Sequence, residues 1–214
     1  IGLSGVLSVY FVQGVNVSPN ELANGLGMPY IVAIIAAVAC ATCIGAINAF
    51  FVAKLKVPSI IITLGTMMLA RGIAQVVTQG AQRNTSLPNE FGVLGNTFVP
   101  GTSVKISVLI MVVLVLGAIA YEKFTVSGRR VYLIGANPVA ARLSGVKVGK
   151  QLAGLFIVSA LLASITGILL ASEYMAGLSN RGTGYEFDAL VVALLGGVSI
   201  AGGFGSVIGM FNIC

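Results

Sequence analysis

The chain has 214 residues, of which 57% are hydrophobic and only 8% are charged, and it contains neither His nor Trp. A soluble domain carries roughly 25% charged residues, so this composition excludes an ordinary soluble protein and predicts an integral membrane protein. The net charge of +6 could indicate nucleic-acid binding, but the basic residues are not gathered on a soluble module. The positive-inside rule for membrane proteins accounts for them more simply, so no nucleic acid is expected as a partner.

The first half of the chain predicts two membrane spans. Residues 1–12 form most of a span whose beginning lies outside the sequence, and a polar turn follows at residues 14–24. The stretch from Tyr30 to Ala53 carries no charge and exceeds the roughly 20 residues that a helix needs to cross a bilayer.

Small and polar residues within the second span indicate how it packs. Ala41, Gly45 and Ala49 recur every four positions and predict a face on which a neighbouring helix packs closely. Asn48 lies beside this face, and its amide is expected to face protein or water. An interhelical hydrogen bond and a contact with a transported substrate both explain it, and the sequence leaves the two open.

A third apolar element begins after Pro58. Ser59, Thr63 and Thr66 recur at helical spacing and form a polar stripe, which either lines a hydrophilic path or bonds back to its own helix. Three residues interrupt the apolar pattern and predict a break or a kink: Gly65, Arg71 and Gly72.

The middle of the chain alternates loops and spans. Residues 80–105 are polar and rich in Gly and Pro, and we expect a loop on one membrane face. Spans are predicted from Ile106 to Tyr121 and from Gln151 to Ser172, separated by a basic interval at residues 122–150.

The basic interval predicts one short helix. Asn137 is a favourable N-cap, Pro138 suits the first helical position and Gly145 suits the residue just past the end, so a helix is expected over residues 138–144. A helix this short is marginal alone in water, which indicates that it docks on a partner.

The basic residues orient the chain. If the interval at 122–150 is cytoplasmic, eight of the twelve basic residues lie inside, three lie outside and Arg71 lies within a segment, in agreement with the positive-inside rule. The inside residues are Lys54, Lys56, Lys123, Arg129, Arg130, Arg142, Lys147 and Lys150, and the outside residues are Arg83, Lys105 and Arg181.

The last part of the chain predicts a re-entrant element. A charged loop at residues 172–188 precedes an uncharged stretch that contains six Gly residues. We expect a half-helix over residues 189–195, a Gly-rich turn over residues 196–205 and a second helix starting near Ser206. Irregular backbone at membrane depth survives only where protein or a water-filled cavity covers it, so this element is a candidate pathway element.

Three runs of sequence resemble one family. They read GAINAFFVAKLKVPSIIITLGTMMLARG, GRRVYLIGANPVAARLSGVKV and GTGYEFDALVVALLGGVSIAGGFGSVIG. Together they resemble the membrane-spanning permease subunits of bacterial ATP-binding-cassette importers for monosaccharides of the ribose, xylose, arabinose and galactose type. The resemblance implies an all-α polytopic membrane protein, a bundle of transmembrane helices with broken or re-entrant segments and a short cytoplasmic coupling helix. It also implies one permease domain over residues 1–214, incomplete at both ends, with residues 122–150 as its cytoplasmic coupling loop.

The resemblance assigns roles to residues of this sequence. The short helix corresponds to the element that sits in a groove on the ATPase subunit, with Ala140, Ala141 and Gly145 at the small-residue positions of the coupling motif. The full set of expected coupling residues is Asn137, Pro138, Ala140, Ala141, Arg142, Leu143, Ser144 and Gly145. The neutral polar lining available to a sugar comprises Asn48, Thr63, Thr66, Gly196, Gly197 and Ser199.

The implied partners are an ATPase subunit that binds ATP and Mg²⁺, a periplasmic or lipid-tethered sugar-binding protein, a second permease copy and the lipid bilayer. The second copy is either identical or related. The sequence contains no Walker-type GxxxxGK[ST] run, so the chain is expected to bind no cofactor and to hydrolyse no ATP itself. The expected location is the bacterial cytoplasmic (inner) membrane, and the expected function is import of a monosaccharide by alternating access.

Two other functional classes fit the sequence less well. Glu186 and Asp188 are compatible with a proton- or sodium-coupled secondary transporter, although Asp188 is also placed to cap the helix that begins at Ala189. An intramembrane enzyme or a metal site has little support without His or paired carboxylates inside a span. Cys40 and Cys43 have CxxC spacing, but they lie in an uncharged span and are interpreted as packed free thiols.

Overall fold

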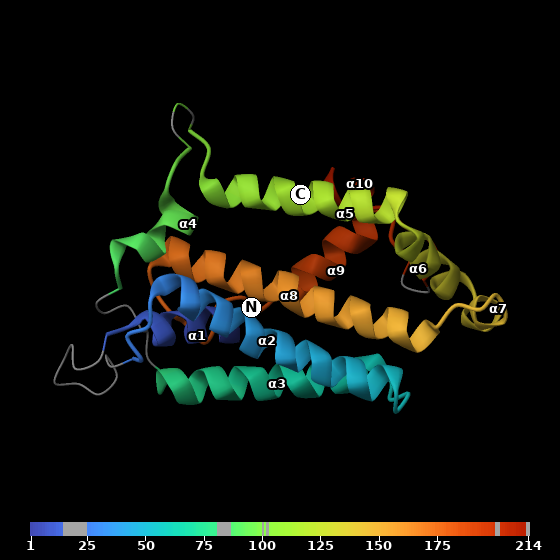
Figure 1. Cartoon of the computed structure of the whole chain (residues 1–214), viewed down its shortest axis with the longest axis horizontal. Helices are drawn as coiled ribbons and strands as arrows, with labels where there is room; N and C mark the ends of the chain where they lie inside the picture. The colour runs from blue at the N-terminus through green and yellow to red at the C-terminus, as the bar shows by residue number, and fades with distance from the viewer. Residues whose placement is uncertain (15–24, 81–86, 100, 102, 200–201, 213–214) are drawn as a thin grey trace. The chain divides into compact units, whose positions relative to one another are not determined.

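The computed structural model describes residues 1–14, 25–80, 87–99, 101, 103–199 and 202–212. Figure 1 shows that most of these residues lie in helices. The described residues contain no β-strand, and an isolated bridge joins Phe98 to Lys105. The expected polar turn at residues 14–24 falls almost wholly outside the described residues. The all-α fold class is confirmed.

In the part of the chain that the structure describes, four helices are long and apolar enough to cross a membrane. They are α2 Tyr30–Ala53, α3 Ser59–Thr78, α5 Ile106–Phe124 and α8 Val148–Tyr174. At most 17% of the best 18-residue window of each helix is buried within the chain. Apolar helices with so little burial place their side chains against lipid or another protein, as the composition predicted.

The chain divides into two compact units, which are described separately. The first contains residues 1–107 and 153–183, and the second contains residues 108–152 and 184–214. The first unit holds α1 Gly2–Val12, α2, α3 and most of α8. The second unit holds most of α5, α6 Val126–Ala136, α7 Pro138–Leu143, α9 Tyr185–Leu195 and α10 Val207–Phe211.

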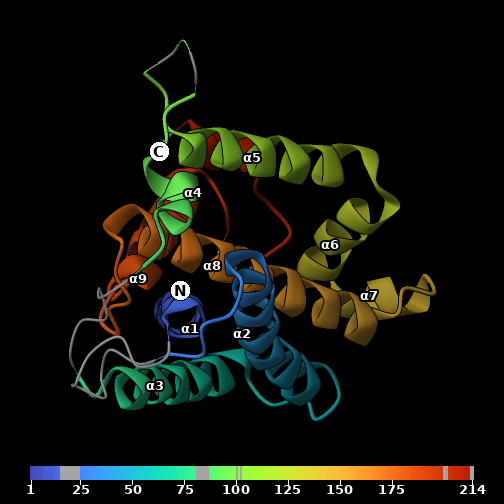
Figure 2. The ribbon, with the colours of Figure 1, turned by 60° about the vertical axis from the view of Figure 1, so that its left-hand side comes forward.

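Helix α1 is the centre of the first unit. Figure 2 shows α1 nearly end-on between α2, α3 and α8. Its apolar residues Leu3, Val6, Val9 and Val12 are all at least 92% buried. A Cβ at Gly5 would lie 2.8 Å from the carbonyl oxygen of Gly167 on α8, so only a residue without a side chain permits this approach.

Helix α2 packs through its small residues, as expected. Gly45 and Ala49 are buried, and so are Ala33 and Ala37 at the same four-residue spacing. A Cβ at Gly45 would collide with Ala160 of α8, since the two backbones approach closely there.

Helix α3 runs without interruption, so the expected break is wrong. Gly65, Arg71 and Gly72 all lie within one α-helix. A Gly residue lowers helix stability by about 1 kcal/mol. In a bilayer every backbone group must form a hydrogen bond within the segment, and this requirement favours a continuous helix despite the glycines.

The expected loop at residues 80–105 contains two short helices, η2 Asn89–Gly92 and α4 Val93–Asn96. Ser172 at the end of α8 holds them, because its hydroxyl donates to the Phe91 carbonyl at 2.5 Å and accepts from the Gly95 N–H at 2.9 Å. Lys105 forms an ion pair with Glu173 at 2.7 Å. This part of the loop is therefore fixed to α8.

Candidate functional site

The expected docking segment begins with a helix that the sequence did not indicate. Helix α6 is capped by Thr125, whose hydroxyl oxygen accepts a hydrogen bond from the Gly128 N–H at 2.9 Å. Gly128 and Gly135 argued against a helix in the sequence, because Gly weakens an isolated helix. Both glycines mark close contacts: a Cβ at Gly128 would lie 3.0 Å from Glu122 Cα, and one at Gly135 would lie 3.0 Å from Gly203 Cα.

The short helix α7 exists as predicted, and its first turn is closed by its own cap. The side-chain oxygen of Asn137 accepts hydrogen bonds from the backbone N–H groups of Val139 and Ala140, both at 3.0 Å. Pro138 occupies the first helical position, where no N–H is required.

The end of α7 is a Schellman motif. Gly145 has φ +80°, its N–H donates to the Arg142 carbonyl, and the Val146 N–H donates to the Ala141 carbonyl, both at 3.0 Å. Ser144 donates its hydroxyl to the Ala140 carbonyl at 3.0 Å. Both ends of this six-residue helix are therefore fixed by local hydrogen bonds.

The two alanines of α7 differ in their surroundings. Ala141 is 3% exposed and packs with Ile134 of α6 and Val148 of α8. Ala140 is exposed to solvent. The Ala141 side chain is covered by its own chain, so of the two alanines Ala140 is the one left exposed for the expected groove of a partner.

The outward face of α7 is apolar. Val139 is 62% exposed and Leu143, one helical turn later, is 86% exposed. Two exposed apolar side chains at i and i+4 form a small docking face. The interval at 122–150 that contains α7 also carries exposed basic side chains: Lys123, Arg129, Arg130, Arg142, Lys147 and Lys150.

Three of the predicted pathway residues lie in the first unit. The Thr66 hydroxyl lies 2.9 Å from Asn48 Oδ1, so α2 and α3 share an interhelical hydrogen bond. Thr66 also lies within reach of the Ile62 carbonyl, and Thr63 donates to the Ser59 carbonyl at 2.8 Å. These bonds match the structural alternative for the polar stripe and leave a substrate contact untested.

The other predicted pathway residues, Gly196, Gly197 and Ser199, lie between α9 and α10. Helix α9 ends at Leu195, and α10 begins after Ser206, whose hydroxyl accepts from the Gly209 N–H at 3.1 Å. Gly197 has φ +82°, and the Ser199 N–H donates to the Phe204 carbonyl at 3.0 Å. The expected half-helix at residues 189–195 lies within α9, and the second helix begins after Ser206 as expected.

The expected cap by Asp188 is wrong. Helix α9 begins at Tyr185, four residues earlier than expected, so Asp188 lies within its first turn and Gly184 is the N-cap. The Gly184 N–H donates to Glu186 Oε2 at 3.1 Å. Both carboxylates lie at the positive end of a helix, where negative charge is stabilised.

A hydrogen-bonded carboxylate that the sequence did not indicate joins three elements of the second unit. Glu122 Oε1 accepts from the Tyr132 hydroxyl at 2.6 Å, and its Oε2 accepts from the Val207 N–H at 2.9 Å. Burial, reinforced by this carboxylate, raises the pKa of Tyr132 to about 12, so the phenol stays protonated at neutral pH. Such a cluster has no local sequence signal, because its members are up to 85 residues apart.

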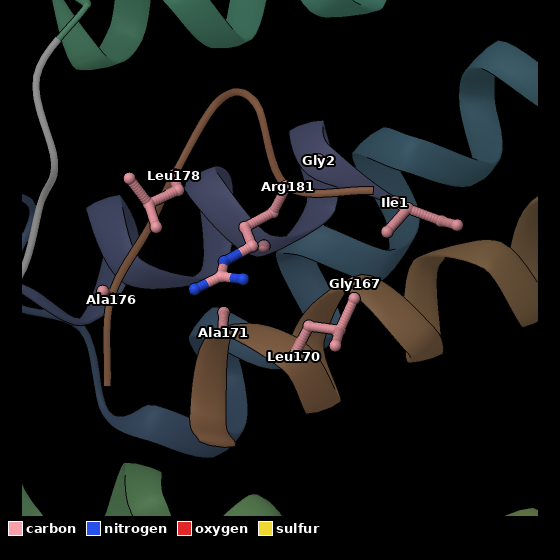
Figure 3. Close-up of a pocket in the computed structure, with 9 residues that line it drawn as sticks. Ile1, Gly2, Gly167, Leu170, Ala171, Ala176, Leu178 and Arg181 are labelled. Atoms are coloured by element: carbon pink, nitrogen blue, oxygen red, sulfur yellow. The ribbon is translucent and has the colours of Figure 1, made fainter. Parts of the chain in front are cut away.

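A small pocket lies in the first unit between α1, the end of α8 and the following loop. Figure 3 shows the Arg181 side chain reaching toward Ala171 in this pocket. The Arg181 guanidinium carbon lies 3.6 Å from the Tyr174 ring centroid, and its Nε makes no hydrogen bond with the described residues. None of the expected coupling or pathway residues lines it.

Among the described residues, the four helices long and apolar enough to cross a bilayer define the class as a multi-pass membrane protein. Over residues 2–213 the chain matches the family described as "Branched-chain amino acid transport system / permease component". The chain belongs to this family of inner-membrane permeases, whose members are not enzymes.

Individual relatives are named for sugar import. The chain is 37% identical to the ribose import permease protein of Escherichia coli, over 96% of this chain and 67% of that protein. It is 31% identical to the galactose/methyl galactoside import permease protein of the same species, over 98% and 64% respectively. It is 34% identical to an autoinducer 2 import system permease protein of Enterobacter sp., over 89% and 54%.

The chain thus spans about two thirds or less of the length of these relatives. No solved structure matches it significantly.

Proposed function

We propose that this chain is the membrane-spanning permease subunit of an ATP-driven importer that moves a monosaccharide inward by alternating access. The observation that carries the proposal is the similarity, above 30% identity over nearly the whole chain, to permeases named for ribose and for galactose. The family description names branched-chain amino acids instead, which makes them the second substrate class to test. The nearer likeness to individual sugar permeases favours the sugar.

In this proposal α7 docks on the ATPase subunit. The support is a helix too short to be stable alone that is capped at both ends and presents Val139 and Leu143 outward. Exposed apolar side chains on a capped helix bind a groove on a partner more tightly than the same side chains on a flexible loop, because less conformational entropy is lost on binding.

The coupling residues then divide into two groups. Asn137, Pro138, Ser144 and Gly145 hold the shape of α7, and Ala141 fixes it to α6. The residues that contact the ATPase are Val139, Ala140, Arg142 and Leu143, all of which are exposed.

The substrate pathway is proposed to include neutral polar groups of both units. These are Asn48, Thr63 and Thr66 in the first unit and Gly196, Gly197 and Ser199 in the second. Sugars are uncharged and rich in hydroxyl groups, so amide, hydroxyl and backbone groups suffice to bind them.

The proposed assembly contains further partners. ATP and Mg²⁺ bind to the ATPase subunit, a periplasmic or lipid-tethered protein delivers the sugar to the outer face, and a second permease copy, identical or related, completes the pathway. The basic residues around α7 support a cytoplasmic orientation for this end of the chain.

The proposal is tested by purifying the native complex through an affinity tag on this permease and reconstituting it in liposomes. We expect an ATPase subunit to co-purify and labelled ribose or galactose to accumulate with ATP. Competition by unlabelled leucine but not by sugars would assign the amino-acid class. Accumulation driven by a proton or sodium gradient without ATP would contradict the proposal.

A further inference from the structure

The structure contains a continuous set of contacts from α7 to the Gly-rich turn between α9 and α10, whose described residues are 196–199 and 202–206. Its first contact is the apolar cluster of Ala141 and Ile134, which joins α7 to α6. Its second lies at the end of α6, where a Cβ at Gly203 would lie 2.8 Å from Ala136 Cα. Close-packed backbones transmit displacement because they cannot compress. A movement of α7 therefore reaches the turn through α6.

One polar cluster joins α6 to the end of α5, to the Gly-rich turn and to α10. The Tyr132 hydroxyl has a single proton and two acceptors, Glu122 Oε1 at 2.6 Å and the Gly205 carbonyl at 2.8 Å. Glu122 Oε2 also accepts from the Val207 N–H at the start of α10. One carboxylate thus connects the end of α5, the middle of α6 and the first turn of α10.

The cluster is suited to this role by its chemistry. A hydrogen bond to a charged acceptor is about twice as strong as one between neutral groups, and a carboxylate at a helix N-terminus is stabilised by the helix dipole. Tyr132 is protonated at neutral pH like any tyrosine, and burial together with the neighbouring Glu122 raises its pKa further, to about 12. The proton has two acceptors, so a small shift of α6 changes which one receives it.

We infer that Glu122 and Tyr132 are positioning residues that couple movement of α7 to the Gly-rich turn between α9 and α10. This inference rests on the proposed function, since it assigns to these residues the transmission of the ATPase stroke to the pathway. They contact neither the ATPase nor the substrate in this account. Their loss uncouples ATP hydrolysis from transport while the outward face of α7 stays intact.

The test compares Tyr132→Phe and Glu122→Gln in the reconstituted native complex. We expect the ATPase subunit to co-purify as with the wild type and basal ATP hydrolysis to stay within about twofold, because α7 is unchanged. Substrate transported per ATP hydrolysed should fall about tenfold, the effect of losing one hydrogen bond to a charged group. The double variant should be no worse than the worse single variant, because both remove one link.

The matched control is Tyr121→Phe. Tyr121 is the residue before Glu122, and its hydroxyl accepts only a long hydrogen bond, 3.3 Å, from Gln151. The same loss of an oxygen atom there should leave the ratio of transport to hydrolysis unchanged. A wild-type ratio in Tyr132→Phe, an equal loss in Tyr121→Phe, or fully additive losses in the double variant would overturn the inference.

A second measurement tests the link without transport. Ala141→Leu overfills the cluster between α7 and α6, and hydrogen–deuterium exchange of residues 202–209 should then quicken at least twofold. The added Tyr132→Phe change should abolish this response to Ala141→Leu. Unchanged exchange in Ala141→Leu would overturn the link between α7 and the turn, even if the complex transports normally. If instead the wild-type complex shows no ATP-driven uptake, the proposed function alone is rejected.

Discussion

Ala140 and Ala141 have the same side chain, yet only one of them faces outward. Ala141 is 3% exposed in the cluster with Ile134 and Val148, and Ala140 is exposed to solvent. Substitution at one position should act on folding and at the other on docking.

Ala141→Trp should lower the thermal stability of the purified permease, because overpacking a filled cluster costs about 1–3 kcal/mol or more for so large a side chain. Ala140→Trp should leave stability within about 0.5 kcal/mol and reduce co-purification of the ATPase. Thermal unfolding in detergent, paired with the ATPase recovered per permease, separates the two effects. The reverse pattern would show that α7 faces the other way.

Asn137→Ala should destabilise α7 by about 1 kcal/mol, because two backbone N–H groups lose their acceptor. If the ATPase binds only the helical form, affinity falls up to about fivefold. Titration of the ATPase subunit onto immobilised permease measures this affinity. Asn137→Asp keeps the cap and serves as the control, and equal affinities for all three proteins would contradict this role.

For single residues, the sequence predicts the features that depend on neighbours within a few positions, such as helix caps. Asn137, Pro138 and Gly145 predicted both ends of α7, since caps depend on neighbours within a few residues. The orientation of Ala141 was not predictable, because it depends on contacts with other helices. Asp188 was misassigned because the start of α9 lies four residues earlier, and helix boundaries are the least reliable feature of a sequence pattern.

At the scale of elements, helix packing in the first unit depends on the absence of a side chain at Gly45. A Cβ there would collide with Ala160 and lie 3.0 Å from the Phe156 carbonyl oxygen, so α2 and α8 would have to separate. By contrast, a Cβ at Gly65 of α3 would meet nothing within 4 Å.

Gly45→Ala should therefore lower the thermal stability of the detergent-solubilised permease by about 1–3 kcal/mol. Gly65→Ala makes the same chemical change in open space and should be neutral or stabilising by up to about 1 kcal/mol. Thermal unfolding of both variants measures the difference, and equal losses in both would refute the close approach of α2 and α8.

The spans were predictable as elements because length and apolar composition alone identify them, and α2 has the expected bounds. Helix α6 was missed because Gly128, Gly135 and two Arg residues indicated a loop, whereas tertiary contacts require those glycines. The prediction of a break in α3 relied too much on its two glycines. A helix inside a membrane cannot leave backbone groups without hydrogen bonds, so α3 continues through them.

For the whole molecule, the role of Glu186 and Asp188 distinguishes ATP from an ion gradient as the energy source of transport. Glu186 and Asp188 lie in the first turn of α9, where the helix dipole stabilises both, and the Gly184 N–H donates to Glu186. Asp188→Asn should therefore retain ATP-driven uptake within about twofold of the wild type in reconstituted liposomes. Loss of uptake with normal folding would indicate a coupling ion at this site instead.

The account as a whole is tested most directly by uptake of labelled ribose and galactose into liposomes that contain the native complex, with no proton or sodium gradient. We predict accumulation that needs ATP on the ATPase side and that persists when an ionophore collapses any proton gradient. Accumulation without ATP, abolished by the ionophore, would contradict the account.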